Sequence, residues 1–160
     1  MKAKRSSADE TEWEEEMARV AAMYISVKKK TPKKAIHEGR LIENFGFESD
    51  AHAGNGRRQV SLLAKESVAR AGGMRTDGLC RGMFAENITT EGIALHTLSV
   101  GTKLKIGDSA VIELTQIGKE CHDGCAVRAR AGQCTLPKEG VFGKVLTGGT
   151  VRENDEITVL

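Results

Sequence analysis

The sequence has little of what marks membrane, secreted or nucleic-acid-binding chains. Aromatic residues make up only 4% of its 160 residues, and opposite charges nearly cancel to a net charge of +2. A near-neutral chain lacks the excess positive charge on which nucleic-acid binding depends. No apolar run approaches the ~20 residues that cross a bilayer, and the N-terminus lacks the basic-then-apolar pattern of a secretory signal. We therefore expect a cytoplasmic protein that binds neither nucleic acid nor membrane.

Cysteines are also few, and the fold does not require them. A chain of 160 residues can bury roughly two-thirds of its unfolded surface without metals or cross-links. Cytoplasmic thiols stay reduced, so clustered cysteines are more often metal-binding or catalytic than disulfide-bonded. Three of the four cysteines lie in GKECHDGCAVRARAGQC, residues 118–134. This cluster is the first candidate for chemistry.

The chain divides into a polar start and a β-rich remainder. Residues 1–17 carry one aromatic side chain and too little apolar surface to offset the entropy of ordering, which predicts a mobile extension. Residues 18–160 are expected to form one domain. Short β-branched runs separated by glycines predict a mainly β (α+β) fold, a small antiparallel β-barrel with one or two short helices.

Individual elements follow from apolar periodicity. Runs typical of strands lie at 20–27, 40–47, 58–64 and 84–93. A hairpin is expected over 102–117, with Ala110, Ile112 and Leu114 on one buried face. The stretch AKESVARAGG, residues 64–73, predicts a short helix that ends at two glycines. A second hairpin is expected to turn at Gly148-Gly149.

The residues of the cysteine cluster leave several kinds of chemistry open. A tetrahedral zinc site could use four soft or borderline ligands, Cys121, His122, Cys125 and Cys134. Adjacent ligands point in different directions and paired knuckle spacings are absent, which argues against zinc. Cys121 and Cys125 could form a redox disulfide. Cys125 and Cys134 could also be small buried hydrophobes.

Cys121 has the setting of a reactive thiol. It follows the end of an expected strand, so it would lie on a loop at the rim of the fold. Its neighbours Lys119 and His122 favour the thiolate, whereas Glu120 opposes it. A thiolate can attack electrophilic sulfur or bind a soft metal.

Two other segments carry candidate ligand-binding residues. In DAHAGNGRR, His52 lies among small residues, and Arg57 and Arg58 lie beside glycines that could let an anion approach. The stretch lacks the GxxxxGK pattern of a phosphate-binding P-loop. In FAENITTEGI, Glu86 and Asn87 could orient a ligand or cap a turn.

Three segments in one order resemble the MOSC domain family, named after the C-terminal domain of molybdenum-cofactor sulfurases. They are DAHAG…RRQVSLLAKES, FAENITTEGIAL…LSVGTKLKIGDSAVIELTQIGKECH…C and CTLPKEGVFGKVLTGGTVRENDEI. The resemblance runs from about Val20 to Leu160 and implies a β-rich barrel in a stand-alone, bacterial-type member. It also implies a role with sulfur or the molybdenum cofactor, a phosphate-bearing pterin that holds the metal through a dithiolene.

The resemblance assigns site residues. The family's characteristic cysteine falls on Cys121, which would carry persulfide sulfur or act as a molybdenum ligand. Its cofactor-binding residues fall on His52, Arg58, Glu86 and Asn87, and Arg57, Lys119 and His122 lie beside them. Many members read Gly-Asp-Arg-His where this chain has Ser-Asp-Ala-His at 49–52. One cofactor-facing arginine is therefore absent.

Alternative functions remain open at the level of sequence. The first is a sulfur carrier, or a molybdopterin-binding module, in cofactor maturation or metal-sulfur delivery. We expect no pyridoxal phosphate in this chain, so sulfur would come from a cysteine desulfurase or another molybdenum-cofactor biosynthesis or acceptor protein. The alternative is a molybdenum-dependent reductase of N-hydroxylated compounds, which would need an electron source. A β-domain with a structural zinc site is the further alternative.

Overall fold

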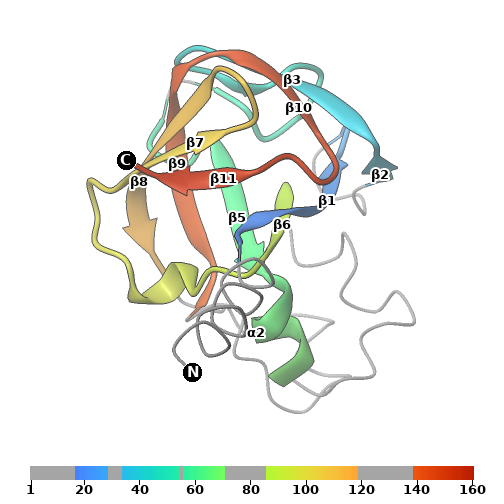
Figure 1. The fold of residues 1–160 in the computed structure, drawn as a ribbon. Coiled ribbons are helices and arrows are strands. Elements are labelled where there is room, and N and C mark those ends of the chain that lie inside the picture. Colours follow the sequence, from blue (N-terminus) through green and yellow to red (C-terminus); the bar gives the residue numbers. More distant parts are fainter. Residues whose placement is uncertain (1–16, 29–33, 55, 71–85, 119–138) are drawn as a thin grey trace, which may run out of the picture.

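Strands dominate the part of the chain that the structure describes. A computed structural model describes residues 17–28, 34–54, 56–70, 86–118 and 139–160. An eight-stranded sheet runs in the order β11-β7-β8-β9-β5-β6-β1-β2, and a three-stranded sheet in the order β10-β3-β4 (Figure 1). The expected mainly β fold is confirmed.

The elements have the following bounds. The larger sheet contains β1 (Arg19–Ile25), β2 (Lys34–Ile36), β5 (Val60–Ala64), β6 (Ile88–Glu91), β7 (Lys103–Ile106), β8 (Ala110–Ile117), β9 (Val141–Thr147) and β11 (Ile157–Val159). The smaller sheet contains β3 (Glu38–Ile42), β4 (Gly46–Phe47) and β10 (Gly149–Arg152). The described helices are α2 (Lys65–Arg70) and the 3-10 helix η2 (Leu95–Thr97). Neither has the length and apolar character needed to span a bilayer.

A closed antiparallel barrel is not supported. β2 and β11 lie at opposite ends of the strand order, and no ladder in the described segments pairs them. An isolated bridge between Arg19 and Glu156 links β1 to the turn before β11, but it does not extend into a ladder. β5 and β6 are also parallel rather than antiparallel. The chain enters α2 directly after β5, and parallel neighbours require such a crossover connection.

Alternating residues of the central strands build the core. β7 buries Leu104 and Ile106 and exposes the two lysines that alternate with them, Lys103 and Lys105. β8 pairs with β7 and buries Ala110, Ile112 and Leu114 completely, as the alternation predicted. Burial of each larger aliphatic side chain contributes about 1.5–3 kcal/mol. This packing fixes β8, whose last residues carry the candidate site.

The second expected hairpin is wrong. β9 leads directly toward β10, yet β9 pairs with β5 and β8, whereas β10 pairs with β3. A Cβ atom at Gly148 would lie 2.6 Å from the Leu41 carbonyl oxygen of β3. Gly148 and Gly149 both lack the positive φ of a tight hairpin turn. These glycines allow the chain to pass closely from one sheet to the other.

Gly143 of β9 provides a test of the contact with β8. A Cβ atom there would lie 2.5 Å from Ile112 Cγ2 and 2.8 Å from the Glu113 carbonyl oxygen. We expect Gly143→Ala to lower the free energy of unfolding by about 2 kcal/mol, as overpacked cores do. Urea denaturation followed by circular dichroism measures this change. Gly54→Ala, where a Cβ atom meets nothing within 4 Å, is the control, and an equal effect of both variants would contradict the packing.

Candidate functional site

The arginine pair lies beside the last residues of β8. The Arg58 Nε donates to Gln116 Oε1 at 3.0 Å, and the guanidinium carbon lies 4.9 Å from the centre of the Phe142 ring. The Thr115 hydroxyl donates to the Arg57 carbonyl oxygen. Both arginine side chains are exposed. The ends of β8 and β9 thus hold a positively charged pair at the surface.

Gly118 marks the point where the chain leaves β8 for residues 119–138. Its φ of 76° favours glycine, and its N–H donates to the Gly140 carbonyl oxygen at 2.7 Å. Its own carbonyl oxygen accepts from Gln116 Nε2 at 2.9 Å. Three residues further along the chain comes Cys121.

Several predicted site residues lie outside the described residues. They are Cys121, Lys119 and His122, together with the other three cysteines Cys80, Cys125 and Cys134. The alternative zinc site therefore lies there as well. Among the residues that the structure does describe, no group of three or more His, Cys, Asp or Glu could hold a metal ion.

His52 lies in an exposed turn, and hydrogen bonds to the buried Asp50 carboxylate hold this turn in place. The Asp50 carboxylate is 5% exposed and accepts from the Ser26 N–H at 2.9 Å and from Asn87 Nδ2 at 3.2 Å. The Ala51 N–H also donates to the Ser26 carbonyl oxygen at 2.6 Å. The His52 side chain is exposed. The contacts of Asp50 and Ala51 therefore hold the backbone of the turn that carries His52.

Asn87 is a buried cross-link, and Glu86 is buried beside it. Asn87 is 2% exposed, and its Nδ2 also donates to the Tyr24 carbonyl oxygen at 3.1 Å. Its Oδ1 accepts from the Ser61 N–H at 3.0 Å. The Glu86 carboxylate, 4% exposed, accepts from the Thr89 hydroxyl at 3.2 Å. The Asn87 amide thus joins β1, β5 and the Asp50 turn from inside the protein.

The structure therefore brings the predicted residues together in two groups. Arg57 and Arg58 meet the end of β8, next to the segment that contains Cys121. Asn87 meets Asp50 and so supports the turn of His52. None of the contacts described above joins the two groups directly.

Comparison with known families identifies the chain. The MOSC domain model matches residues 48–158, which is well over half of the 160-residue chain. The chain belongs to the MOSC domain family. The matched range includes His52, the arginine pair and Cys121. The resemblance seen in the sequence is thereby confirmed.

Solved structures share the fold of this MOSC domain. The YUAD protein from Bacillus subtilis has a TM-score of 0.73 at 18% identity, with 88% of this chain and 94% of that chain covered. YiiM from Geobacillus stearothermophilus has a TM-score of 0.62 at 16% identity, with 89% and 75% covered. YiiM from Escherichia coli has a TM-score of 0.59 at 18% identity, with 89% and 69% covered. No curated protein matches the chain in sequence.

The MOSC domain contains a further polar cluster that sequence reasoning missed. The Ser67 hydroxyl donates to Glu139 Oε1, although these residues are 72 positions apart, and His96 Nδ1 lies 3.9 Å from the same oxygen. A cavity of about 310 Å³ adjoins the cluster and is lined by Ala64, Glu66, Ser67, Gly92, Ile93, Ala94 and His96. Only the fold brings α2, η2 and the start of β9 together, so no local motif could indicate this cluster.

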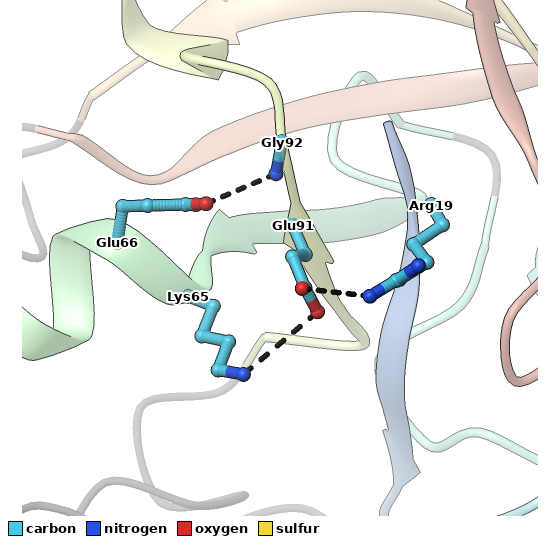
Figure 2. A network of polar contacts seen from close by, with 5 residues as sticks. All are labelled: Arg19, Lys65, Glu66, Glu91 and Gly92. Carbon is cyan, nitrogen blue, oxygen red and sulfur yellow. Dashed lines mark hydrogen bonds and ion pairs between the residues drawn. The ribbon is translucent and has the colours of Figure 1, made fainter. Parts of the chain in front are cut away.

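Polar contacts between α2 and β6 fix one wall of that cavity (Figure 2). The Gly92 N–H donates to Glu66 Oε2 at 3.0 Å. The Glu91 carboxylate lies between Arg19 Nη2, at 3.0 Å, and Lys65 Nζ, at 3.8 Å. These ion pairs are partly exposed, so each stabilises the fold by less than about 1 kcal/mol. Their main effect is to hold the start of α2 against the end of β6.

Proposed function

We propose that this MOSC domain carries sulfur or binds the molybdenum cofactor for a partner protein, with Cys121 as the working thiol. One observation carries the proposal. Within the residues that match the MOSC model, the Arg58 side chain is hydrogen-bonded to Gln116 at the end of β8, and the segment that contains Cys121 begins just after this strand. Cys121 follows Gly118 by three residues in the sequence. Arg58 thus adds a positive charge at the point where the Cys121 segment begins. We infer that this charge favours the thiolate.

The residues present fit the phosphate of molybdopterin. Arg58 uses its Nε for Gln116, and its two terminal nitrogens make no hydrogen bond to any residue that the structure describes. A planar guanidinium can bind phosphate through two parallel hydrogen bonds. We assign phosphate binding to Arg58 and Arg57, and metal contact to Cys121. When bound, the cofactor would supply the redox-active metal.

The remaining site residues act around this centre. His52 faces solvent from a turn that Asp50 and Asn87 hold in place. We assign His52 a contact with the anionic ligand. Lys119 and His122 flank Cys121 in the sequence and add positive charge beside the thiolate. Asn87 contributes by supporting the turn from inside through Asp50, and Glu86 lies buried next to it in the chain.

Sulfur transfer at Cys121 needs no external oxidant. The Cys121 thiolate attacks the outer sulfur of a persulfide on a cysteine desulfurase. A new S–S bond forms at Cys121, the S–S bond of the donor breaks, and the donor cysteine leaves as a thiolate. Such exchange is fastest when the attacking thiol has a pKa near ambient pH. A reduced thiol is required, which favours the cytoplasm as the location.

Mass spectrometry and metal analysis of protein purified from its native host test this function. We expect either one additional sulfur atom on the Cys121 peptide or molybdenum with a pterin in the same sample. Molybdenum together with reduction of an N-hydroxylated compound by an added electron donor would establish the reductase alternative. A stoichiometric zinc ion would establish the structural alternative. A bare Cys121 thiol without metal, in protein from its own host, would contradict the proposal.

The domain boundaries belong to the same proposal. We assign residues 18–160 to the MOSC domain and residues 1–17 to an extension that takes no part in the site. The proposed ligand contacts all fall after residue 50. A variant that lacks the extension should therefore carry the same sulfur or metal.

A further inference from the structure

The cavity beside α2 combines apolar walls with polar groups. It has a volume of about 310 Å³ and lies where α2 and η2 meet the ends of β5 and β6. Ala64, Ile93 and Ala94 form apolar parts of its lining. Small-molecule sites in proteins begin at about 300 Å³ and are mostly apolar, with a few polar groups that fix orientation. The cavity therefore has the size and composition of a site for a molecule of a few heavy atoms.

Glu66 presents a fixed carboxylate at this cavity. The Gly92 N–H donates to Glu66 Oε2 at 3.0 Å, and both residues line the cavity (Figure 2). Glu66 Oε1 makes no hydrogen bond or ion pair with any residue that the structure describes. The adjacent Lys65 is directed to Glu91 instead, with 3.8 Å between Nζ and Oε1. One oxygen of Glu66 is therefore available to a ligand, and the neighbouring cation is engaged elsewhere.

A second carboxylate adds negative charge next to the cavity. Glu139 Oε1 accepts from the Ser67 hydroxyl, and the Glu139 side chain is only 18% exposed. His96 Nδ1 lies 3.9 Å from the same oxygen, which is too long for a hydrogen bond, and it hydrogen-bonds to none of the described residues. No lysine or arginine is among the described residues that line the cavity. Partly buried charges are screened less than exposed ones, so the two carboxylates favour a cation here.

The arrangement of the two carboxylates favours one kind of cation. A metal ion is a poor match, because no group of three or more His, Cys, Asp or Glu in the described ranges could hold one. A guanidinium binds best to both oxygens of one carboxylate, whereas Gly92 and Ser67 each occupy one oxygen of a carboxylate. An ammonium group is a compact charge that single oxygens can bind.

We propose that this cavity binds a primary alkylammonium group. The ammonium nitrogen donates to Glu66 Oε1, and the alkyl chain lies against Ile93 and the two alanines. The site shares no residue with the arginine pair, the His52 turn or Cys121. It therefore stands or fails separately from the proposed function.

Titration of the ¹⁵N-labelled full chain with butylammonium at pH 7 and constant ionic strength tests the site. The probe is protonated at this pH, as lysine is. We expect the amide signals of Ile93 and Ala94 to shift and to saturate with a Kd of about 1–10 mM, which suits a ligand of so few heavy atoms. n-Butanol, which has the same alkyl chain without the charge, should bind at least ~tenfold more weakly. Butyrate should give no saturable shift.

Glu66→Gln is the decisive variant, because it keeps the size of the side chain and an acceptor for Gly92 but removes the charge. We expect its Kd for butylammonium to rise about tenfold, the difference between a charged and a neutral acceptor. Glu139→Gln can still accept from Ser67, so it should raise the Kd only about threefold, through the loss of charge alone. Glu113→Gln removes the same charge from the middle of β8 and should leave the Kd unchanged. Thermal unfolding shows whether each variant is folded.

Other results would overturn the assignment. Equal affinity for butylammonium and n-butanol would show that the cavity does not select a cation. An unchanged Kd in folded Glu66→Gln would remove the assigned acceptor, and the lack of any saturable shift at Ile93 and Ala94 would refute the site. If Glu66→Gln does not fold, Glu139→Gln decides in its place, and an unchanged Kd there would contradict the role of charge.

A lysine derivative identifies the source of the alkylammonium group. Nα-acetyl-lysine N-methylamide carries the same butylammonium unit on a peptide-like backbone. Binding as tight as that of butylammonium would support the site and assign it to a lysine side chain of a partner protein. Binding at least ~tenfold weaker would support it as a site for a free amine.

Discussion

Cys121→Ser should abolish persulfide loading by a cysteine desulfurase and leave the fold intact. A serine hydroxyl stays protonated at neutral pH and is a weak nucleophile, so it cannot attack the outer sulfur of the donor persulfide. The change nearly keeps the size of the side chain, and a domain of this length does not need a cysteine to fold. We therefore expect complete loss of loading with an unchanged circular dichroism spectrum.

The measurement uses the desulfurase, labelled cysteine and peptide mapping after the persulfide is trapped. Cys80→Ser and Cys134→Ser are matched controls and should load like the wild type. Normal loading of the Cys121→Ser variant, or first labelling at Cys125 or Cys134, would show that another cysteine carries the sulfur. Equal protection of Cys121, Cys125 and Cys134 that a chelator removes would instead indicate zinc.

Local pattern predicted the strands whose faces differ in burial. In β7 and β8 one face lies in the core and the other meets solvent, so alternation in the sequence reports the structure directly. The failed hairpin shows where this reasoning ends. A glycine pair fits either a tight turn or a close passage between strands, and Gly148-Gly149 belongs to the second case because β3 lies against it.

Long-range pairing was the part of the fold that the sequence could not reveal. The helix after β5 was expected, but the parallel pairing of β5 with β6 depends on where β6 returns to the sheet. Whether a sheet closes depends on long-range pairing, and here the isolated bridge between Arg19 and Glu156 does not extend into a ladder. No local pattern in the sequence indicates such pairing. A strand-rich sequence with glycine turns is compatible with open and closed sheets alike.

The residues of the candidate site could be predicted from the sequence, but their long-range partners could not. Arg58 could be selected from the sequence because arginine beside glycines is suited to bind anions. Its partner Gln116 lies 58 residues away and reaches it only through a bulge in β8. Asn87 could likewise be singled out as a polar residue at a strand start. Its partners Ser61 and Asp50, 26 and 37 residues away, show that it is a cross-link.

Asn87→Ala should have the largest effect on stability of the substitutions considered. It removes the hydrogen bonds that the Asn87 side chain makes to Tyr24, Asp50 and Ser61, and all of these lie in buried or part-buried surroundings. Buried groups that lose a partner cost about 1–3 kcal/mol each, so we expect the free energy of unfolding to fall by about 3 kcal/mol. Urea denaturation followed by circular dichroism measures the loss.

The control is Lys105→Ala, an exposed change in β7 that should alter stability by less than about 0.5 kcal/mol. If Asn87 only contacted a ligand, its substitution would weaken molybdopterin or phosphate binding and would leave the free energy of unfolding unchanged. An unfolding free energy equal to that of the control would therefore show that Asn87 is not the cross-link described. The expected loss of stability would show that buried hydrogen bonds support the His52 turn. Asn87 contacts that turn through the carboxylate of Asp50, which is itself buried.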